Sequence, residues 1–361
     1  MAGWTQVAAS GLNESKEISW CRDTTRNTLF VLKRSGKSNL SDGQIYHWNG
    51  TTLTPVSAPT FSANEYYNCI DYDPTGDNIV VSGGHDGGFS DAWYGYDGAS
   101  AFPGSVIWNT VNTNIDRAGI FGIHRHNSGE AYTLWSNNQG GSASAIYTLS
   151  SLGDTSATGG VTITAGNSST IQNAAQSIRV NGTTPYVAVF HGIDISGTST
   201  RLMIAAVASN KSVTTYNTSH TNSNITPSEP GVELCQPIAF DDHDASLITM
   251  TDGTNSAIYY VTSAGVVRRH DLLGEATCGA ARMDDTVFVA TRARKLYRAD
   301  LPITGDNQFI DASLPVPIGA TELRGLSTNH SNNGLLAWAV DGRVLQTVSQ
   351  VGVPQLLAHG G

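Results

Sequence analysis

Histidine and aspartate are the residues of this sequence best suited to hold a metal ion. His124 and His126 stand two residues apart on a predicted strand, so their side chains point the same way, as two metal ligands would. Asp241, Asp242, His243 and Asp244 form a dense acidic turn that could bind calcium, although the EF-hand spacing is absent. The alternatives are partly exposed imidazoles at a turn and a solvated acidic turn. We predict no metal and no cofactor.

Motifs of the common hydrolytic and nucleotide-binding sites are missing. The sequence contains no GxSxG, no HExxH and no Asp-box turn of the form Ser-x-Asp-x-Gly-x-Thr-Trp. The glycine-rich stretch GGHDGG at 83–88 lacks the lysine and helix of a phosphate-binding loop, so we interpret it as a flexible loop. Carboxylates from different parts of the chain could still form a glycosidase pair, which keeps a hydrolase as the third functional hypothesis.

The composition predicts an all-β chain. Hydrophobic residues make up 39% of the 361 residues and charged residues only 14%, while 38 glycines and many Ser, Thr and Asn supply the polarity. These polar residues suit strands and tight turns better than helices. Four cysteines, Cys21, Cys69, Cys235 and Cys278, lie far apart without a CxxC pair, so we predict buried, unpaired thiols.

Charge and hydropathy restrict the partners. The net charge is −10 and no run of Lys or Arg exists, which argues against a nucleic-acid partner. The segment MAGWTQVAASG lacks the basic and apolar regions of a signal peptide, and no stretch has the ~20 apolar residues of a membrane helix. We therefore expect no membrane insertion and a location in the cytoplasm or in a virion.

An internal repeat fixes the predicted architecture. Ile-Tyr or Leu-Tyr recurs at Tyr46, Tyr147, Tyr259 and Tyr297, and Tyr94, Met203 and Leu345 fill the intervening places. Short apolar strands flank each copy on both sides, such as TLFVLKR upstream of Tyr46 and TLTPVSA downstream. Four strands per unit and about seven units, 40 to 55 residues apart, predict one seven-bladed β-propeller of antiparallel strands.

The predicted propeller is a single domain over residues 1–361. The blades are expected at about 15–61, 62–112, 113–166, 167–221, 222–274, 275–319 and 320–361. Residues 1–14 contain GWTQVAA, which we predict to be an outer-type strand that pairs with the last blade and helps to close the ring. Whether it replaces or supplements PQLLAHG (354–360) stays open.

Two segments resemble known propeller families. IDYDPTGDNIVVSGGHDG resembles a WD-repeat blade, although AWYGYDG stands where the closing Trp-Asp is expected, and no other unit repeats the pattern. GWTQVA and IYHWNGTTLTPV are loosely similar to tectonin-type lectin propellers. Both resemblances imply the β-propeller superfamily and no particular function.

Arginines and aromatic residues are the candidate site residues. One arginine falls on the first strand of each of five units, and these are Arg22, Arg125, Arg179, Arg282 and Arg324. First strands surround a propeller's channel, so an anion could bind there; the alternative is that each arginine pairs with an Asp or a carbonyl of the next blade. The loops of the first four units are long on one face, at 35–42, 83–91, 137–144 and 192–200. Aromatic and histidine residues on or beside that face are candidate contacts for a partner: Tyr66, Tyr67, His85, Phe89, Trp93 and Trp135. The alternative for the two tryptophans is a core position at a strand end.

Three functions remain open. The Ser/Thr/Asn/Gly-rich, weakly charged all-β composition resembles phage virion proteins in style, which favours a non-catalytic component of a tail, collar or capsid surface with other subunits as partners. A carbohydrate-binding lectin that recognises a surface glycan is the alternative, since aromatic residues in polar loops suit sugars. A propeller hydrolase is the least favoured.

Overall fold

The computed structural model describes most of the predicted strands. The described residues are 3–9, 18–33, 44–56, 65–73, 78–85, 91–97, 106–112, 124–125, 131–135, 144–149, 158–163, 188–196, 199–207, 213–225, 233–234, 238–262, 264–312 and 322–348. In the strands between 65 and 221, side chains are described only at residues 70–72 and 79. The one helix within all these ranges is a 3-10 turn, η2 (Asp241–His243), so the described chain is all-β.

The described strands pair antiparallel into seven sheets, five of them with four strands. The first three sheets contain β2 (Ser19–Asp23), β3 (Thr28–Lys33), β4 (Gln44–Trp48) and β5 (Leu53–Val56); β6 (Glu65–Asp73), β7 (Asn78–His85), β8 (Asp91–Asp97) and β9 (Val106–Asn112); and β10 (His124–Arg125), β11 (Ala131–Trp135), β12 (Ser144–Leu149) and β13 (Thr158–Ile163). The fourth has three described strands, β14 (Ala188–Ser196), β15 (Ser199–Val207) and β16 (Val213–Asn222). We number the sheets one to seven in this order.

The last three sheets are described most completely. Sheet five contains β17 (Glu233–Leu234), β18 (Ile238–Phe240), β19 (Ala245–Thr251), β20 (Ser256–Thr262) and β21 (Val267–Leu272), with β17 and β18 both paired to β19. Sheet six contains β22 (Thr277–Met283), β23 (Thr286–Thr291), β24 (Leu296–Asp300) and β25 (Ile310–Asp311), and sheet seven contains β26 (Leu323–Thr328), β27 (Leu335–Ala339), β28 (Arg343–Val348) and β1 (Gly3–Ala9). The repeated Tyr, Met or Leu positions fall on β4, β8, β12, β15, β20, β24 and β28, one in each sheet.

The consecutive sheets whose side chains are described pack face to face, which explains their burial patterns. All side chains of β19 and β27 are buried, whereas those of the outer strand β21 are mostly half-buried. A strand that is buried on both faces needs a sheet against each face. Separate apolar clusters fill the interfaces between sheets one and two, five and six, six and seven, and seven and one.

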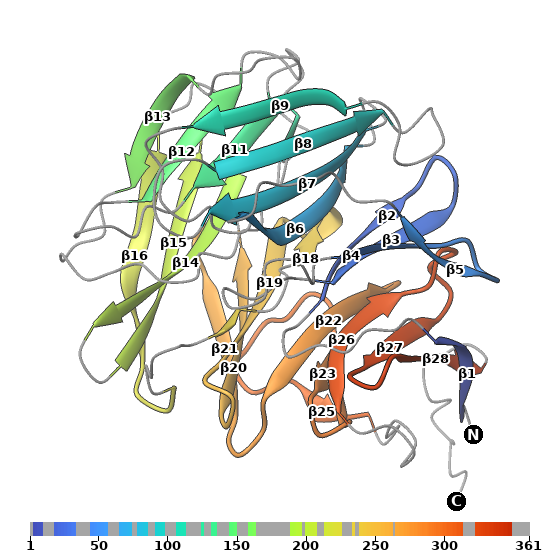
Figure 1. The fold of residues 1–361 in the computed structure, drawn as a ribbon. Helices are drawn as coiled ribbons and strands as arrows, with labels where there is room; N and C mark the ends of the chain where they lie inside the picture. The colour runs from blue at the N-terminus through green and yellow to red at the C-terminus, as the bar shows by residue number, and fades with distance from the viewer. Residues whose placement is uncertain are drawn as a thin grey trace, which may run out of the picture.

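The innermost strands approach one another closely. A Cβ atom on Gly279 of β22 would lie 2.6 Å from the backbone nitrogen of Leu326 on β26, so only glycine allows this approach. The backbone N–H of Ile18 donates to the carbonyl of Arg324 at 2.9 Å, which joins the first sheet to the last. Figure 1 shows the sheets arranged about a common middle, with β6, β19 and β22 toward it.

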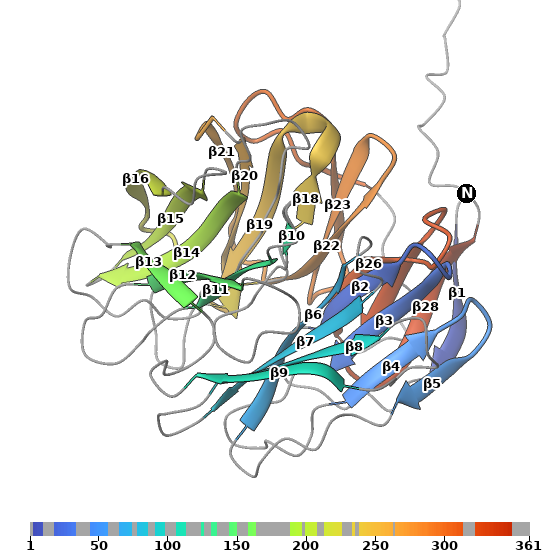
Figure 2. The same cartoon turned by 90° about the horizontal axis from the view of Figure 1, so that it is seen from above.

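The beginning of the chain completes the last sheet. β1 pairs antiparallel with β28, from Gly3 opposite Val348 to Ala9 opposite Arg343, as the sequence predicted. In Figures 1 and 2, β1 lies beside β28 although the two come from opposite ends of the chain. The partly buried Val7 and Ala8 pack against the cluster between sheets seven and one. The competing segment 354–360 lies outside the described residues.

Two loop predictions are wrong. Residues 192–200 are not a long loop: β14 continues to Ser196 and pairs with β15, which begins at Ser199, so the hairpin connection has two residues. Gly83, Gly84 and His85 also belong to a strand, β7, and pair with β6. Glycine and polar residues led to both errors, because ladder hydrogen bonds in a paired strand can override low β propensity.

The cysteine prediction is confirmed where the side chains are described. Cys21 and Cys278 are buried thiols that form no disulfide. The side chain of Cys69 and the whole of Cys235 lie outside the described part. Within the described ranges, no helix has the length and apolar character of a membrane span.

Candidate functional site

Strand β21 presents the largest group of described charged side chains on one element. Its sequence, Val-Arg-Arg-His-Asp-Leu, places Arg269 and Asp271 on one face and Arg268 and His270 on the other, because strand side chains alternate. β20 pairs with one edge of β21. The segment Ile303–Phe309 from sheet six covers the other edge: Asp306 Oδ1 accepts from the N–H of Arg269 at 2.8 Å, and Asn307 N–H donates to the Arg269 carbonyl at 3.0 Å.

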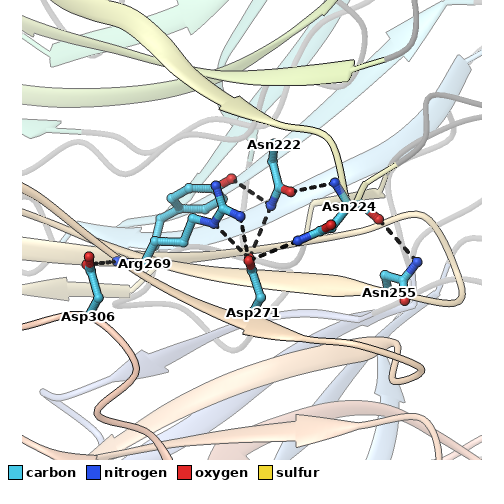
Figure 3. Close-up of polar contacts among 7 residues, drawn as sticks. Asn222, Asn224, Asn255, Arg269, Asp271 and Asp306 are labelled. Carbon is cyan, nitrogen blue, oxygen red and sulfur yellow. Dashed lines mark hydrogen bonds and ion pairs between the residues drawn. The ribbon is translucent and has the colours of Figure 1, made fainter.

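The first face of β21 binds the end of sheet four (Figure 3). The guanidinium of Arg269 donates to both oxygens of Asp271, through Nε at 2.8 Å and through a still closer contact from Nη2. Asn222 and Asn224 each donate an amide hydrogen bond to Asp271 at 3.2 Å. The Asp271 carboxylate therefore accepts four hydrogen bonds, as many as its oxygens usually accept.

The surrounding groups hold these asparagines in place. Asn222 is fully buried at the end of β16, donates to the Tyr259 hydroxyl at 3.3 Å and accepts the N–H of Asn224 at 2.9 Å. Asn255 donates to the Asn224 carbonyl at 3.1 Å and accepts the N–H of Gly274 at 2.9 Å (Figure 3). The result is a polar clamp between sheets four and five, which we call the Asp271 clamp.

Electrostatics stabilise the ionised form of Asp271. Burial alone would raise the pKa of Asp271, but the hydrogen bonds and charge of Arg269, with those from Asn224 and Asn222, hold this pKa below its usual value. A carboxylate with a lowered pKa is a poor proton donor and a poor base. The clamp therefore suits structure rather than acid–base chemistry.

The second face of β21 is less fully bonded. Arg268 and His270 line a shallow depression with Ile303, Asn307 and Phe309, and its empty space of about 170 Å³ includes open solvent. The His270 ring packs at a tilt against Phe309 at 5.6 Å and against Tyr297 at 6.4 Å, both between ring centroids. Burial lowers the pKa of His270, although the charge of Asp271 opposes this.

Neither Arg268 nor the Nδ1 atom of His270 has a described polar partner. The Nδ1 atom of His270 is buried and accepts or donates no hydrogen bond. Arg268 forms no ion pair with any of the residues that the structure describes. Buried polar atoms of native proteins nearly always have a partner, so the Nδ1 atom of His270 is one of several exceptions among the described residues.

The acidic turn at η2 is an ion pair between sheets five and six. Arg282 of β22 donates to both oxygens of Asp242, at 2.6 and 2.5 Å, and its Nη2 lies 3.6 Å from Asp285. Its guanidinium carbon lies 5.6 Å from the centre of the Phe240 ring, a cation–π contact. Hydrogen bonding to Arg282 lowers the pKa of Asp242 to about 2.

The same turn contains a group with metal-ligand geometry. One ligand atom each from Asp242, His243 and Asp285 lies within 4.8 Å of the other two. Arg282 already supplies the positive charge there, so an ion pair fits these distances better than a metal ion. Asp242 is also half exposed, which suits a solvated turn.

The five arginines predicted to line the channel differ in the ion pairs that they form and in how much of each is described. Arg282 pairs with Asp242 and Asp285, and Arg324 pairs with Glu322 at 2.9 Å. Arg22 lies half-buried on β2, where burial lowers its pKa, and it forms no ion pair with a described residue. Arg125 lies on β10 with only its backbone described, and Arg179 lies outside the described residues. Anion binding by these residues stays a prediction.

The predicted partner residues are located through their backbone. Tyr66 and Tyr67 begin β6 and pair with Gly84 and Gly83, directly before His85 at the end of β7. Trp93 lies near the start of β8, opposite Ser82, and so at the same end of sheet two. Trp135 ends β11 in sheet three, at its pairing with the start of β12. Phe89 and His126 lie outside the described residues, whereas His124 lies on β10.

The sequence predicted β21 only as one of the short strands that flank the repeated positions, here downstream of Tyr259. The alternation in VRRHDL already places Arg268 and His270 on one face, and this signal could have identified the pair. The partners of Asp271 could not be found in this way, because Asn222 stands 49 residues away in the chain.

Comparison with solved structures shows the fold type. The chain is similar to a chain of a mitotic checkpoint complex (12% identity, 95% of this chain and 93% of that chain, TM-score 0.56). It is also similar to hydrazine synthase of Kuenenia stuttgartiensis (11% identity, 96% of this chain and 97% of that chain, TM-score 0.61). A third similar structure is BBS1N in complex with ARL6DN (11% identity, 97% of this chain and 98% of that chain, TM-score 0.56). No family model and no curated protein matches the sequence. At these identities the likeness carries only the fold, and this chain is an all-β protein of the β-propeller type.

Proposed function

We propose that this chain is a non-catalytic interaction protein, built as a seven-bladed β-propeller, whose partners are other subunits of a larger assembly. Seven sheets among the described strands support the blade number, and the packing of sheet seven against sheet one supports a closed ring. A virion tail, collar or capsid surface remains the predicted setting, on composition alone.

The pairing of acidic side chains is the observation that carries the non-catalytic proposal. The ion pairs among the described residues include seven carboxylates: Asp23 with Arg26, Asp242 and Asp285 with Arg282, Asp271 with Arg269, Glu275 with Lys295, Glu322 with Arg324, and Asp341 with Arg343. A glycosidase needs one carboxylic acid with a raised pKa to protonate the leaving group. The shifts resolved for these carboxylates, at Asp242, Asp271 and Asp341, are all downward, which disfavours the hydrolase alternative.

The proposed partner surface is the end of sheets two and three that carries Tyr66, Tyr67, His85, Trp93 and Trp135, together with Phe89. Tyr66, Tyr67, His85 and Trp93 lie at one end of sheet two, and Trp135 lies at the end of β11 in sheet three, which supports this choice of surface. Aromatic residues there would act as buried anchors for a protein partner. A glycan, the alternative ligand, would use the same aromatic residues.

Mass measurement tests the assembly proposal. Native mass spectrometry of the particle isolated from its natural source should find the chain bound to other subunits. Phe89→Ala and Trp93→Ala should each weaken that association by about 1 to 3 kcal/mol. Leu273→Ala is the matched control, since Leu273 is 66% exposed and lies next to β21 in sheet five. If the chain is instead monomeric and binds glycans on an array, the lectin replaces this proposal. If the monomeric chain hydrolyses glycans, the hydrolase replaces it.

A further inference from the structure

Two hairpin turns of the chain share their hydrogen bonds but begin with different residues. Residues 49–52 (Asn-Gly-Thr-Thr) join β4 to β5, and residues 252–255 (Asp-Gly-Thr-Asn) join β19 to β20. In each turn the N–H of the first residue donates to the carbonyl of the fourth, at 3.4 and 3.1 Å. The glycines have similar positive φ angles, +95° at Gly50 and +88° at Gly253. The first turn therefore repeats the second, with asparagine in place of aspartate.

The side-chain oxygen of Asn49 faces two backbone donors. The N–H groups of Thr51 and Thr52 donate to Asn49 Oδ1 at 3.0 and 2.7 Å, and the Asn49 side chain is exposed to solvent. The corresponding bonds to Asp252 Oδ1 measure 2.9 and 2.7 Å. Two backbone N–H groups aimed at one carbonyl oxygen stabilise negative charge that develops on it. A nucleophile that attacks Cγ of Asn49 therefore meets these donors already in place.

An imidazole from the last sheet lies beside Gly50. A Cβ atom on Gly50 would lie 2.3 Å from Cε1 and 2.5 Å from Nε2 of His330, so this ring lies against the Gly50 Cα, which is bonded to the peptide nitrogen. Burial lowers the pKa of His330, which keeps the ring neutral at neutral pH and able to accept a proton. The second turn differs here: the described neighbour of a Cβ on Gly253 is Arg292 Nη1, at 3.8 Å, and a guanidinium accepts no proton.

We propose that the 49–52 turn is a site of self-catalysed deamidation, in which the peptide nitrogen of Gly50 attacks the side-chain amide of Asn49. The N–H groups of Thr51 and Thr52 stabilise the charge on Oδ1, and His330 accepts the proton of Gly50. This chemistry uses only residues of the chain and water, and it does not depend on the proposed assembly function.

The bonds and the proton balance as follows from these positions. The Gly50 nitrogen gives its proton to the imidazole and forms a bond to Asn49 Cγ, from which only the Asn49 carbonyl carbon, Cα and Cβ separate it along the chain. The bond between Cγ and Nδ2 then breaks, and Nδ2 takes the proton from the imidazole and leaves as ammonia. A succinimide ring remains. Water opens this ring to aspartate or to isoaspartate.

The second turn indicates which product the fold retains. Asp252 has the first position with the same hydrogen bonds, so aspartate at position 49 keeps the turn. Isoaspartate would add a methylene to the backbone where Gly50 meets His330. Trp48, directly before the turn, belongs to the apolar cluster between sheets seven and one, and Leu53 packs against that cluster. The isoaspartate product would therefore disturb the contact between the first and last sheets.

Another described Asn-Gly pair, Asn333–Gly334, lacks both features. Its Asn333 Oδ1 accepts the side-chain amide of Asn329 at 2.6 Å, and no described backbone N–H donates to this oxygen. The atoms nearest to a Cβ on the buried Gly334 belong to Asn329, Thr347 and Gln346, and none of these is an imidazole. This pair has neither the two donors nor the base, so it is an internal control.

Peptide mapping by mass spectrometry measures conversion at each position of the full chain. During incubation at neutral pH, Asn49 should be converted about tenfold faster in the folded chain than in the same chain unfolded in guanidinium chloride, because the base and the donors are positioned only by the fold. Asn333 should be converted more slowly in the folded chain than in the unfolded one. Conversion of Asn49 that is equal or slower in the folded chain overturns the proposal.

Two variants test the part of His330. Asp252→Asn is the matched control, since it places an Asn-Gly pair in the second turn without an imidazole, and this pair should be converted more slowly than Asn49. His330→Ala should slow conversion of Asn49 about tenfold, and free imidazole should restore part of the rate in this variant alone.

Equal rates at positions 49 and 252, or an unchanged rate at Asn49 in His330→Ala, overturn the proposal. Unchanged thermal melting shows that each variant is folded. If His330→Ala lowers the melting temperature, the comparison of positions 49 and 252 decides.

Discussion

The two faces of β21 use similar residues in opposite ways. On one face, Asp271 accepts hydrogen bonds from Arg269, Asn222 and Asn224, and the group joins two sheets. On the other face, Arg268 forms no described ion pair and the Nδ1 atom of His270 has no hydrogen-bond partner. Both faces belong to the same six-residue strand, so local sequence does not explain the difference.

The difference lies in what packs against each face. The end of β16 supplies two amides to the first face, whereas the Gln308 amide of the segment that borders the second face bonds Thr304 of the same segment. A polar group whose bonds are complete stabilises the fold, while one whose bonds are incomplete is available to a ligand. The predictions that follow separate these two roles.

Removal of the Asp271 carboxylate should have the largest effect. Asp271→Ala removes the carboxylate that pairs with Arg269 and one acceptor of the buried Asn222. Losing one member of a buried pair costs about 3 to 5 kcal/mol, and partial exposure of both side chains reduces this to about 2 kcal/mol. Urea denaturation measures the loss. Asp306→Ala, which removes only an exposed acceptor of Arg269 N–H, should cost less than 1 kcal/mol, about one neutral hydrogen bond.

Truncation of Asn222 should cost somewhat less. Asn222→Ala removes hydrogen bonds to Tyr259, Asp271 and Asn224 but leaves no charge unpaired, so we expect a loss of about 1 to 2 kcal/mol in the free energy of unfolding. In a double-mutant cycle with Asp271→Ala, the coupling should exceed about 0.5 kcal/mol. Strict additivity of the two losses would contradict the clamp.

Acid should affect the two faces in separate pH ranges. Since burial holds the pKa of His270 below 6.5 in the fold, the unfolded state binds protons first, and stability falls as the pH drops below about 6.5. The pKa of Asp271 is lowered from 3.8, so its contribution persists above that value and is lost only at lower pH. Denaturation at pH 7.5 and 5.5 should show a smaller loss in His270→Gln than in the unchanged protein. Part of the loss in stability should remain in His270→Gln, because burial also lowers the pKa values of His47 and His330.

Substitution of Arg268 should have the smallest effect on stability. Because this guanidinium has no described ion pair to lose, Arg268→Gln should change the free energy of unfolding by less than about 0.5 kcal/mol. The same urea denaturation measures it beside Asp271→Ala. A loss as large as that of Asp271→Ala would show that Arg268 is structural, and the contrast between the faces would disappear.

The sequence predicted those features that depend on local periodicity. The recurring apolar segments around Tyr46, Tyr259 and Tyr297 placed strands correctly, because such segments supply the side chains that these strands bury. The pairing of the N-terminal strand with the last sheet followed from its strand-like pattern. The range 192–200 was misread because Gly192 and the serines resemble a loop, whereas β14 continues to Ser196 and pairs with β15.

The site depends on contacts that no local pattern contains. Arg22, Arg282 and Arg324 look alike as arginines on first strands, yet only the folded chain shows that Arg282 meets Asp242, forty residues earlier. The same holds for Asn222 and Asp271. Such pairs depend on which sheet packs against which, and on the register between them. Single-sequence periodicity predicts neither.

The pairing of β1 with β28 has a consequence for synthesis on the ribosome. Ala9 and Arg343 form a pair, although one leaves the ribosome long before the other. At about 5 to 20 residues per second, β1 waits for tens of seconds before its partner exists. During that time it is an unpaired strand, open to other chains. The final sheet of this protein is therefore the one whose assembly most depends on protection of the nascent chain.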